Sequence, residues 1–287
     1  MIHTFFTHTA EKGSKCTLWW TRRPANRQAQ PSADREIMRA STVDLVADTA
    51  RAAAGRRTMA WFAGGFAGAA VVAGGWLAPP DQAQGQAQRL MYLHVPAAWV
   101  GYAAFAVVLA ASAAYLIGGD LRWDRFARAG AEIGVSLTAA AIATGSLWGH
   151  LVWGTWWAWD PRLVSTALLL LAYAGYLALR RALAERTGAR DGADHRVARP
   201  AAVVGVAGFL LVPVVHFSVV WWRSLHQQAT VLAPERPPID PRMGVALLLA
   251  VAAATLAALC LLLHRVVRLE RQLAASPVAE RTPVRVG

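Results

Sequence analysis

The sequence predicts an all-α membrane protein, a bundle of six transmembrane helices with both termini in the cytoplasm. Three observations lead to this prediction. Of the 287 residues, 56% are hydrophobic and only 16% are charged, whereas soluble domains carry about a quarter charged residues. Six apolar segments are long enough to cross a bilayer, which takes about 20 residues. Arginine is distributed unevenly among the connecting loops, and this asymmetry sets the orientation of membrane helices.

The six segments are all rich in Ala, Leu, Val and Gly. Small residues allow membrane helices to approach closely, so a compact bundle is expected. The fourth segment is the shortest. The predicted spans are residues 59–79, 95–119, 130–151, 163–179, 200–222 and 243–263.

Arginine content predicts which loops face the cytoplasm. Loops 120–129 and 180–199, with the flanks of the first and last spans, hold 15 arginines, and the opposite loops hold 5. Positive residues favour the cytoplasmic side of a membrane. The termini and these two loops are therefore predicted to be cytoplasmic. The loops around 80–94, 152–162 and 222–242 are predicted to face outward.

Outside the spans, the chain divides into an N-terminal extension and a short tail. Residues 1–58 are polar and contain no span. They are predicted to be a cytoplasmic extension, in which residues 1–31 are disordered or precede a true start at Met38, with a helix on the membrane surface over 34–57. Residues 59–265 then form the membrane domain, and residues 266–287 form a basic cytoplasmic tail.

Composition weighs against several functions. The net charge is +12, but there are only two lysines and most arginines flank apolar segments, so no nucleic-acid partner is expected. The two cysteines, Cys16 and Cys260, form no CxxC or CxxCH motif, which argues against a thiol oxidoreductase or a c-type cytochrome. No GxxxxGK[ST] loop is present, so energy input is expected from partner proteins. The chain is predicted not to be an enzyme.

The three outward loops hold most of the unusual residues. RLMYLHVPAAW places His94 at the start of the second span, and PVVHFSVVWWRSLHQQ places His216 within the fifth span and His226 just beyond it. Neutral imidazole is a common ligand of haem iron. His94 and His226, from separate loops at one membrane level, are therefore candidates to bind opposite faces of one planar macrocycle. A simple hydrogen-bonded role remains open for each.

The stretch GHLVWGTWWAWDPRL carries four tryptophans within seven residues. Tryptophan concentrates at membrane interfaces, which accounts for single tryptophans but not for this cluster around Gly154, Asp160 and Arg162. A flat apolar surface with polar groups at its border would suit a porphyrin. Arginine binds carboxylates bidentately, so Arg89 and Arg162 are candidates for the carboxylates of haem, although contact with lipid headgroups fits their positions equally well.

These motifs resemble the CcmC family of haem exporter proteins of bacterial cytochrome c maturation. The matching stretches are RLMYLHVPAAW, GSLWGHLVWGTWWAWDPRL and PVVHFSVVWWRSLHQ, and with the six-span layout the resemblance covers about residues 59–265. The resemblance implies a protein that binds haem b at the outer face of the inner membrane and assists its covalent attachment to the haem chaperone CcmE. It also implies partnership with the ATP-binding-cassette pair CcmA and CcmB and the small protein CcmD.

The resemblance also implies roles for individual residues. His94 and His226 would be the axial ligands of the haem iron, with Arg89 and Arg162 beside them. The surface for haem and chaperone would consist of Trp153, Trp156, Trp157, Trp159 and Asp160. The chain departs from the family pattern at His150, Pro161, Val164 and Val220, none of which belongs to this main set.

Two other functions remain open from the sequence. A membrane electron carrier of the cytochrome b type would favour two haems and four histidines within the spans, whereas only His216 lies well within one. A small-molecule permease usually bears ionisable residues within the membrane, whereas Glu132 is the only acidic residue in a predicted span. An absorption spectrum of the purified protein would distinguish one haem, two haems or none.

Overall fold

A computed structural model of the chain describes residues 54–188, 192–227 and 239–274. Within these ranges it contains no strand and six helices that are long and apolar enough to cross a membrane, so the predicted all-α class with six spans is confirmed. The orientation of the termini stays a prediction. The predicted N-terminal surface helix falls mostly on residues that lie outside the described ranges, as does the end of the basic tail.

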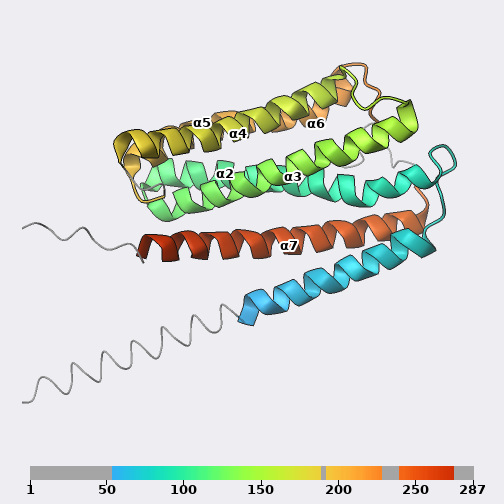
Figure 1. Ribbon diagram of the computed structural model, residues 1–287, viewed down its shortest axis with the longest axis horizontal. Coiled ribbons are helices and arrows are strands. Elements are labelled where there is room, and N and C mark those ends of the chain that lie inside the picture. The colour runs from blue at the N-terminus through green and yellow to red at the C-terminus, as the bar shows by residue number, and fades with distance from the viewer. Residues whose placement is uncertain (1–53, 189–191, 228–238, 275–287) are drawn as a thin grey trace, which may run out of the picture. The chain divides into compact units, whose positions relative to one another are not determined.

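The helices follow one another in a simple order (Figure 1). The first span, Ala54–Leu77, ends in a π-helical turn, η1 (Ala73–Leu77), and a short 3-10 helix, η2 (Gln86–Leu90), leads into the second span. The next helices are α2 (Met91–Gly118), α3 (Leu121–Trp153) and α4 (Pro161–Thr187). The fifth span consists of α5 (His195–Phe209) and α6 (Leu211–Trp221), and the last is α7 (Pro241–Ala274).

Several helices extend beyond the predicted apolar segments. The third begins at Leu121 instead of residue 130, and the fourth continues to Thr187 instead of residue 179. The length of an apolar segment indicates only the part of a helix that lies in the hydrocarbon of the bilayer. The helical hydrogen bonds continue beyond it, through the polar turns that carry arginine.

Four helices begin with the same local pattern, an aspartate followed two residues later by an arginine. In each case the aspartate Oδ1 accepts a hydrogen bond of 2.8 Å from the backbone N–H of that arginine. Such an N-terminal cap stabilises a helix by about 0.5–2 kcal/mol because it satisfies a backbone donor that has no partner within the helix. The four aspartates are Asp120, Asp160, Asp194 and Asp240.

The fifth span is interrupted at Leu210, between α5 and α6. Pro213 lies three residues beyond the interruption. Proline has no backbone N–H, and its ring crowds the carbonyl four residues earlier, here that of Phe209. The sequence therefore explains why two helices form where one apolar segment was predicted.

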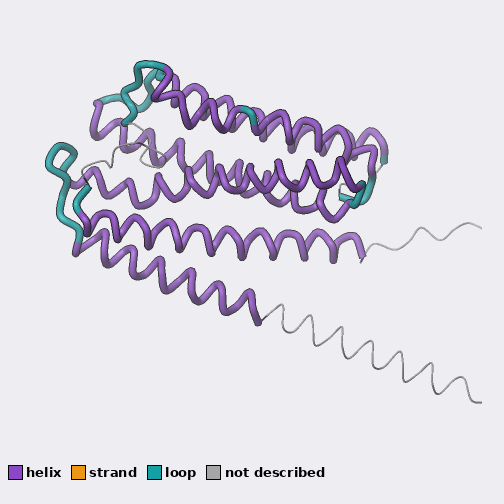
Figure 2. The backbone as a smooth tube through the Cα atoms, turned by 180° about the vertical axis from the view of Figure 1, so that it is seen from behind, coloured by secondary structure: helices purple, strands orange, loops and turns teal. Residues whose placement is uncertain are grey.

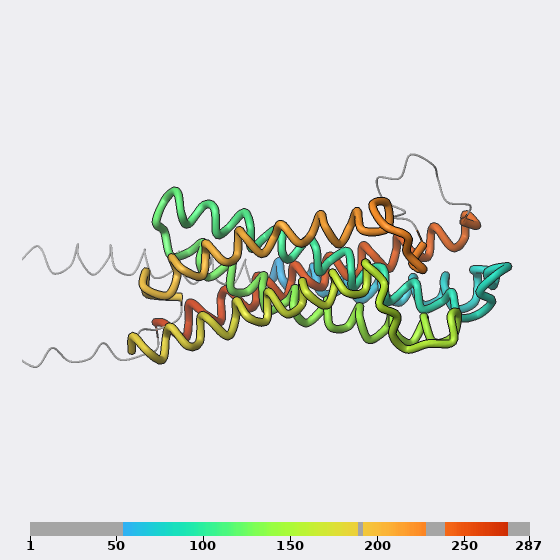
Figure 3. Tube along the Cα trace, turned by 90° about the horizontal axis from the view of Figure 1, so that it is seen from above, coloured from blue at the N-terminus to red at the C-terminus, as the bar shows by residue number. Residues whose placement is uncertain are grey.

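The helices run lengthwise beside one another (Figures 1 and 3). The most extensive contact joins α2 to α3, while α4 packs against α3, α5 and α6, and α7 packs against α2 and α3. The core lies where α2 to α6 meet. There Phe105 stacks on Tyr173 with ring centroids 3.9 Å apart, and the Tyr173 hydroxyl donates to the Gly205 carbonyl at 3.1 Å.

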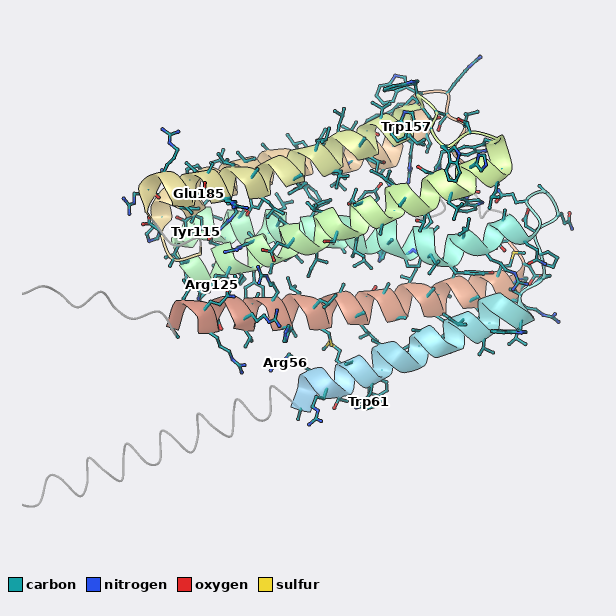
Figure 4. All side chains as sticks on the ribbon, viewed as in Figure 1. Arg56, Trp61, Tyr115, Arg125, Trp157 and Glu185 are labelled. Carbon is teal, nitrogen blue, oxygen red and sulfur yellow. The ribbon has the colours of Figure 1, made fainter. Side chains whose placement is uncertain are left out.

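The connecting loops gather at two ends of this bundle (Figure 2). Trp157 lies at one end, and Arg125 and Glu185 lie at the other (Figure 4). Near the second end, a fully buried ion pair joins α4 to α3. The Arg180 guanidinium donates to the two carboxylate oxygens of Asp124 at 2.7 and 2.6 Å, and to the Tyr176 hydroxyl at 3.0 Å.

Candidate functional site

A cavity of about 270 Å³ lies at the tryptophan-bearing end, between α2, α3, α4, α6 and the loop of residues 222–227. Its wall is mostly apolar and aromatic, and it carries a few polar groups, among them Tyr102, Arg162 and the two histidines His94 and His226. Pockets of this composition bind a largely apolar ligand and fix its orientation by a few polar contacts.

The structure brings His94 and His226 together in this cavity. Their ring centroids are 6.3 Å apart and the ring planes are inclined by 41°. A bond between a metal and an imidazole nitrogen is about 2 Å long, so two rings bound on opposite sides of one metal ion have centroids about 6 Å apart. The observed separation fits two imidazoles that share one metal ion.

Both imidazoles contact a backbone carbonyl through the same ring nitrogen. Nδ1 of His94 lies 2.9 Å from the Ala141 carbonyl oxygen, and Nδ1 of His226 lies 2.8 Å from that of Gln227. A carbonyl oxygen only accepts, so each Nδ1 carries the proton and donates it. The Nε2 lone pair then remains for a metal, and the backbone contact fixes the ring.

The charge state of His226 also suits metal binding. Burial lowers the pKa of His226 below its ordinary value, and the nearby positive charge of Arg162 lowers it further. Neutral imidazole is the form that binds a metal. The surroundings therefore favour the binding form at neutral pH.

Gly145 of α3 determines how closely that helix approaches His94. A Cβ atom at Gly145 would lie 2.8 Å from Cε1 and 3.1 Å from Nδ1 of the His94 ring. The first distance is shorter than real Cβ contacts, and the second is tighter than most of them. Any larger residue at this position would therefore displace the ring from where it lies.

The four tryptophans of the predicted surface fall into two groups. Trp153 and Trp157 line the cavity. Trp156 and Trp159 are exposed and do not line it. The Trp156 ring stacks on His150 at 4.2 Å, and Trp159 meets Trp157 edge-on at 6.0 Å. The cluster thus has an inner pair and an outer pair.

Sequence reasoning missed Trp148 and Gln84, which also line the cavity. The Trp148 indole N–H donates to Oε1 of Gln84 at 2.9 Å, and its ring meets that of His94 edge-on at 5.8 Å. Helical spacing offered a signal for the tryptophan, because Ala141, Gly145 and Trp148 follow one another at intervals of four and three residues and so share a face of α3.

The two predicted arginines lie in different surroundings. Arg162 lines the cavity and donates to the backbone carbonyl of His216, at 3.2 Å. Arg89 does not line the cavity. Its guanidinium donates to the carbonyl of Gly75 in η1 and thereby joins η2 to the end of the first span. Of the two, Arg162 is the cation available to a ligand in the cavity.

Asp160, which was predicted at the border of the tryptophan cluster, is buried. It is only 5% exposed. Its Oδ1 accepts hydrogen bonds from the Arg162 N–H and the Ser224 hydroxyl, and its Oδ2 accepts one from the Leu225 N–H. The carboxylate therefore joins the start of α4 to the loop that carries His226.

The chain is similar to proteins named Heme exporter protein C. The family model of that description, CcmC, matches residues 44–278. The protein of that name from Bradyrhizobium diazoefficiens is 39% identical over 180 residues, which are 63% of this chain and 65% of that protein. The Escherichia coli protein is 36% identical over 188 residues, 64% of this chain and 71% of that protein. The Haemophilus influenzae protein is 34% identical over 184 residues, 64% and 72% of the respective chains.

Proposed function

The chain belongs to the Heme exporter protein C family, and we propose on that basis that it binds haem b between His94 and His226 and presents it for covalent attachment to the haem chaperone CcmE. The single observation that supports this most strongly is the pair of imidazoles 6.3 Å apart in one cavity. Two axial imidazoles are a ligand set that haem iron accepts, and both rings have Nδ1 held by a backbone carbonyl.

The rest of the cavity suits the remaining parts of haem. The macrocycle is flat and apolar, and Trp99, Trp153 and Trp157 line the cavity with flat apolar surface. The carboxylates of haem require a cation, and Arg162 lines the same cavity. Its planar guanidinium binds a carboxylate bidentately. In this proposal the chain holds and orients haem as cargo, and catalyses no reaction by itself.

The proposal also covers the location of the protein and its partner proteins. The protein lies in the bacterial inner membrane, with the haem site facing the periplasm and both termini in the cytoplasm. Energy input comes from the ATP-binding-cassette pair CcmA and CcmB, with CcmD as a further partner. The distribution of arginine, 15 against 5 between the two sets of loops, supports this orientation.

Copurification tests the proposed function directly. We expect the full chain, purified from cells that make CcmE, to carry one haem by its absorption spectrum, and CcmE from the same cells to carry covalently bound haem. Wild-type protein that never contains haem, and whose deletion leaves the yield of haem-linked CcmE unchanged, would contradict the proposal. Two haems per chain would instead indicate an electron carrier.

Topology reporters test the orientation. A reporter fused after Arg125 should give a cytoplasmic signal, and one fused after Trp157 a periplasmic signal, because the loops on the first side are rich in arginine. The two positions lie at opposite ends of the bundle (Figure 4), so the signals must differ. A periplasmic signal after Arg125 would reverse the proposed orientation.

Gly145→Ala tests the contact between α3 and His94. The added methyl group would overlap the His94 ring, so we expect haem content to fall and the absorption spectrum to change. Gly175→Ala is a matched control, because Gly175 also lies within a helix and an added Cβ would meet no atom within 4 Å apart from the neighbouring backbone of that helix. Equal haem content in the two variants would contradict the argued role of Gly145.

Trp157→Ala and Trp159→Ala distinguish the binding of haem from its transfer to CcmE. Trp157 lines the cavity and Trp159 does not, so only the first substitution should lower haem content. The loss should be partial, because one ring contributes through contact area and the neighbouring rings partly replace that area. Trp157→Ala should give less haem-linked CcmE because it holds less haem, and Trp159→Ala because its exposed ring contacts the chaperone in this proposal. Haem per protein and the yield of haem-linked CcmE are measured together, and a normal yield in Trp159→Ala would exclude the chaperone contact.

A further inference from the structure

The start of α4 differs from two helix starts of the same sequence pattern. At the starts of α3 and α5, the arginine side chain also contacts the carboxylate of the aspartate that caps the helix. Arg122 Nε lies 2.8 Å from Asp120 Oδ2, and Arg196 Nη2 lies 2.7 Å from Asp194 Oδ2. At α4, Oδ2 of Asp160 accepts from the Leu225 N–H instead, and the Arg162 guanidinium donates to the His216 carbonyl. The carboxylate of Asp160 is thus directed to another part of the chain.

Ser224 carries this connection to His226. Its hydroxyl oxygen lies 3.0 Å from Oδ1 of Asp160 and 3.0 Å from the backbone nitrogen of His226. The N–H of His226 only donates, so the hydroxyl accepts from it and donates its own proton to the carboxylate. Leu225 donates to the other carboxylate oxygen at 2.7 Å. Three successive residues are therefore tied, directly or through one hydroxyl, to one buried carboxylate.

The loop offers little other regular structure to hold His226. Residues 222–227 follow the end of α6 and form no helix or strand. Hydrogen bonds to an ionised acceptor are roughly twice as strong as neutral ones, and Asp160 is itself fixed as the cap of α4. The position of the His226 backbone therefore depends on α4, which also carries Arg162.

We propose that Ser224 and Asp160 are positioning residues that hold His226 against the metal of the bound ligand, an inference that rests on the proposed haem site. Neither side chain lines the cavity, so both act through His226. Residues that orient a metal ligand in this way change metal affinity about 10–100-fold when they are mutated. Ser224→Ala should therefore weaken haem binding about 10-fold or more and leave part of the bound haem without its second imidazole.

The test compares full-length variants that differ by single groups. Ser224→Ala removes the hydroxyl, and Ser224→Thr keeps it. Asp160→Asn keeps the size of the side chain but has one acceptor oxygen where three donors converge. Ser165→Ala is the matched control, because the Ser165 hydroxyl lies 2.6 Å from the Pro161 carbonyl and 3.2 Å from that of Arg162, within α4.

Haem affinity and absorption spectra are measured for each purified variant, with and without added imidazole. We expect Ser224→Ala and Asp160→Asn to bind haem more weakly, with a spectrum shifted toward that of His226→Ala. Added imidazole should restore the wild-type spectrum, because it replaces the displaced ligand. Ser224→Thr and Ser165→Ala should match the wild type. A general packing defect would not be rescued by imidazole, so failure of that rescue would overturn the positioning role.

The outcomes distinguish this inference from the proposed function. Wild-type affinity and spectrum in Ser224→Ala, beside an altered spectrum in His226→Ala, would overturn the positioning role and leave the haem site intact. An unaltered spectrum in His226→Ala would instead overturn the ligand assignment on which the inference rests.

Discussion

Replacement of His94 or His226 by alanine is expected to abolish delivery of haem to CcmE and to lower the haem content of the purified protein. In the proposed haem site, each substitution would remove one of two directional bonds to iron and leave an open coordination site. The loss should exceed that of any single tryptophan, because a ring contributes through contact area that its neighbours partly replace. Haem per protein is measured by absorption, beside the yield of haem-linked CcmE.

His264→Ala is the matched control for these variants. His264 is exposed on α7 and does not line the cavity, so its loss should leave both measurements at wild-type values. Normal transfer in both His94→Ala and His226→Ala would exclude the two imidazoles as the ligands of the transferred haem.

Arg180→Met is expected to produce the largest loss of stability. The substitution would leave the carboxylate of Asp124, which is 1% exposed, without its bidentate partner. Removal of one member of a buried ion pair costs about 3–5 kcal/mol, because the remaining charge stays buried and unpaired. Thermal unfolding in detergent should show a clear fall in the melting temperature, and haem binding at the opposite end should change only as far as the protein unfolds.

Two further variants make this prediction specific. Arg181→Met removes the neighbouring arginine, whose side chain is 84% exposed and pairs with Glu185. Exposed ion pairs contribute at most about 1 kcal/mol, so this variant should unfold close to the wild-type temperature. The double variant Arg180→Met with Asp124→Leu removes both charges and should recover much of the stability. An Arg180→Met variant as stable as Arg181→Met would contradict the assigned role of the pair.

The spans were predictable from the sequence because the length of an apolar segment directly reflects the thickness of hydrocarbon. The approach of His94 and His226 followed from the same argument, since alternate loops of a six-span chain lie at the same end. The break at Leu210 was also accessible through Pro213, but an apolar run alone does not reveal it. Most of the fold could therefore be predicted from the lengths of the apolar segments and from local signals such as proline.

The side-chain partners of the site were less accessible. Arg89 lies five residues before His94, yet its guanidinium contacts Gly75 in the first span. Asp160 lies next to the tryptophans in sequence, yet its carboxylate accepts hydrogen bonds from Ser224 and Leu225, which lie 64 and 65 residues further along the chain. Periodicity indicates which face of a helix a residue occupies, but not which distant donor meets it. Such partners depend on how the helices pack.

The two imidazoles are positioned by different helices. His94 lies on α2, which packs most extensively against α3, and His226 is tied through Asp160 to α4, which packs against α6. Between these helices, Phe105 of α2 stacks on Tyr173 of α4 in the core. The separation of the two imidazoles therefore depends on how α2 and α4 pack against each other, at a contact that involves neither histidine.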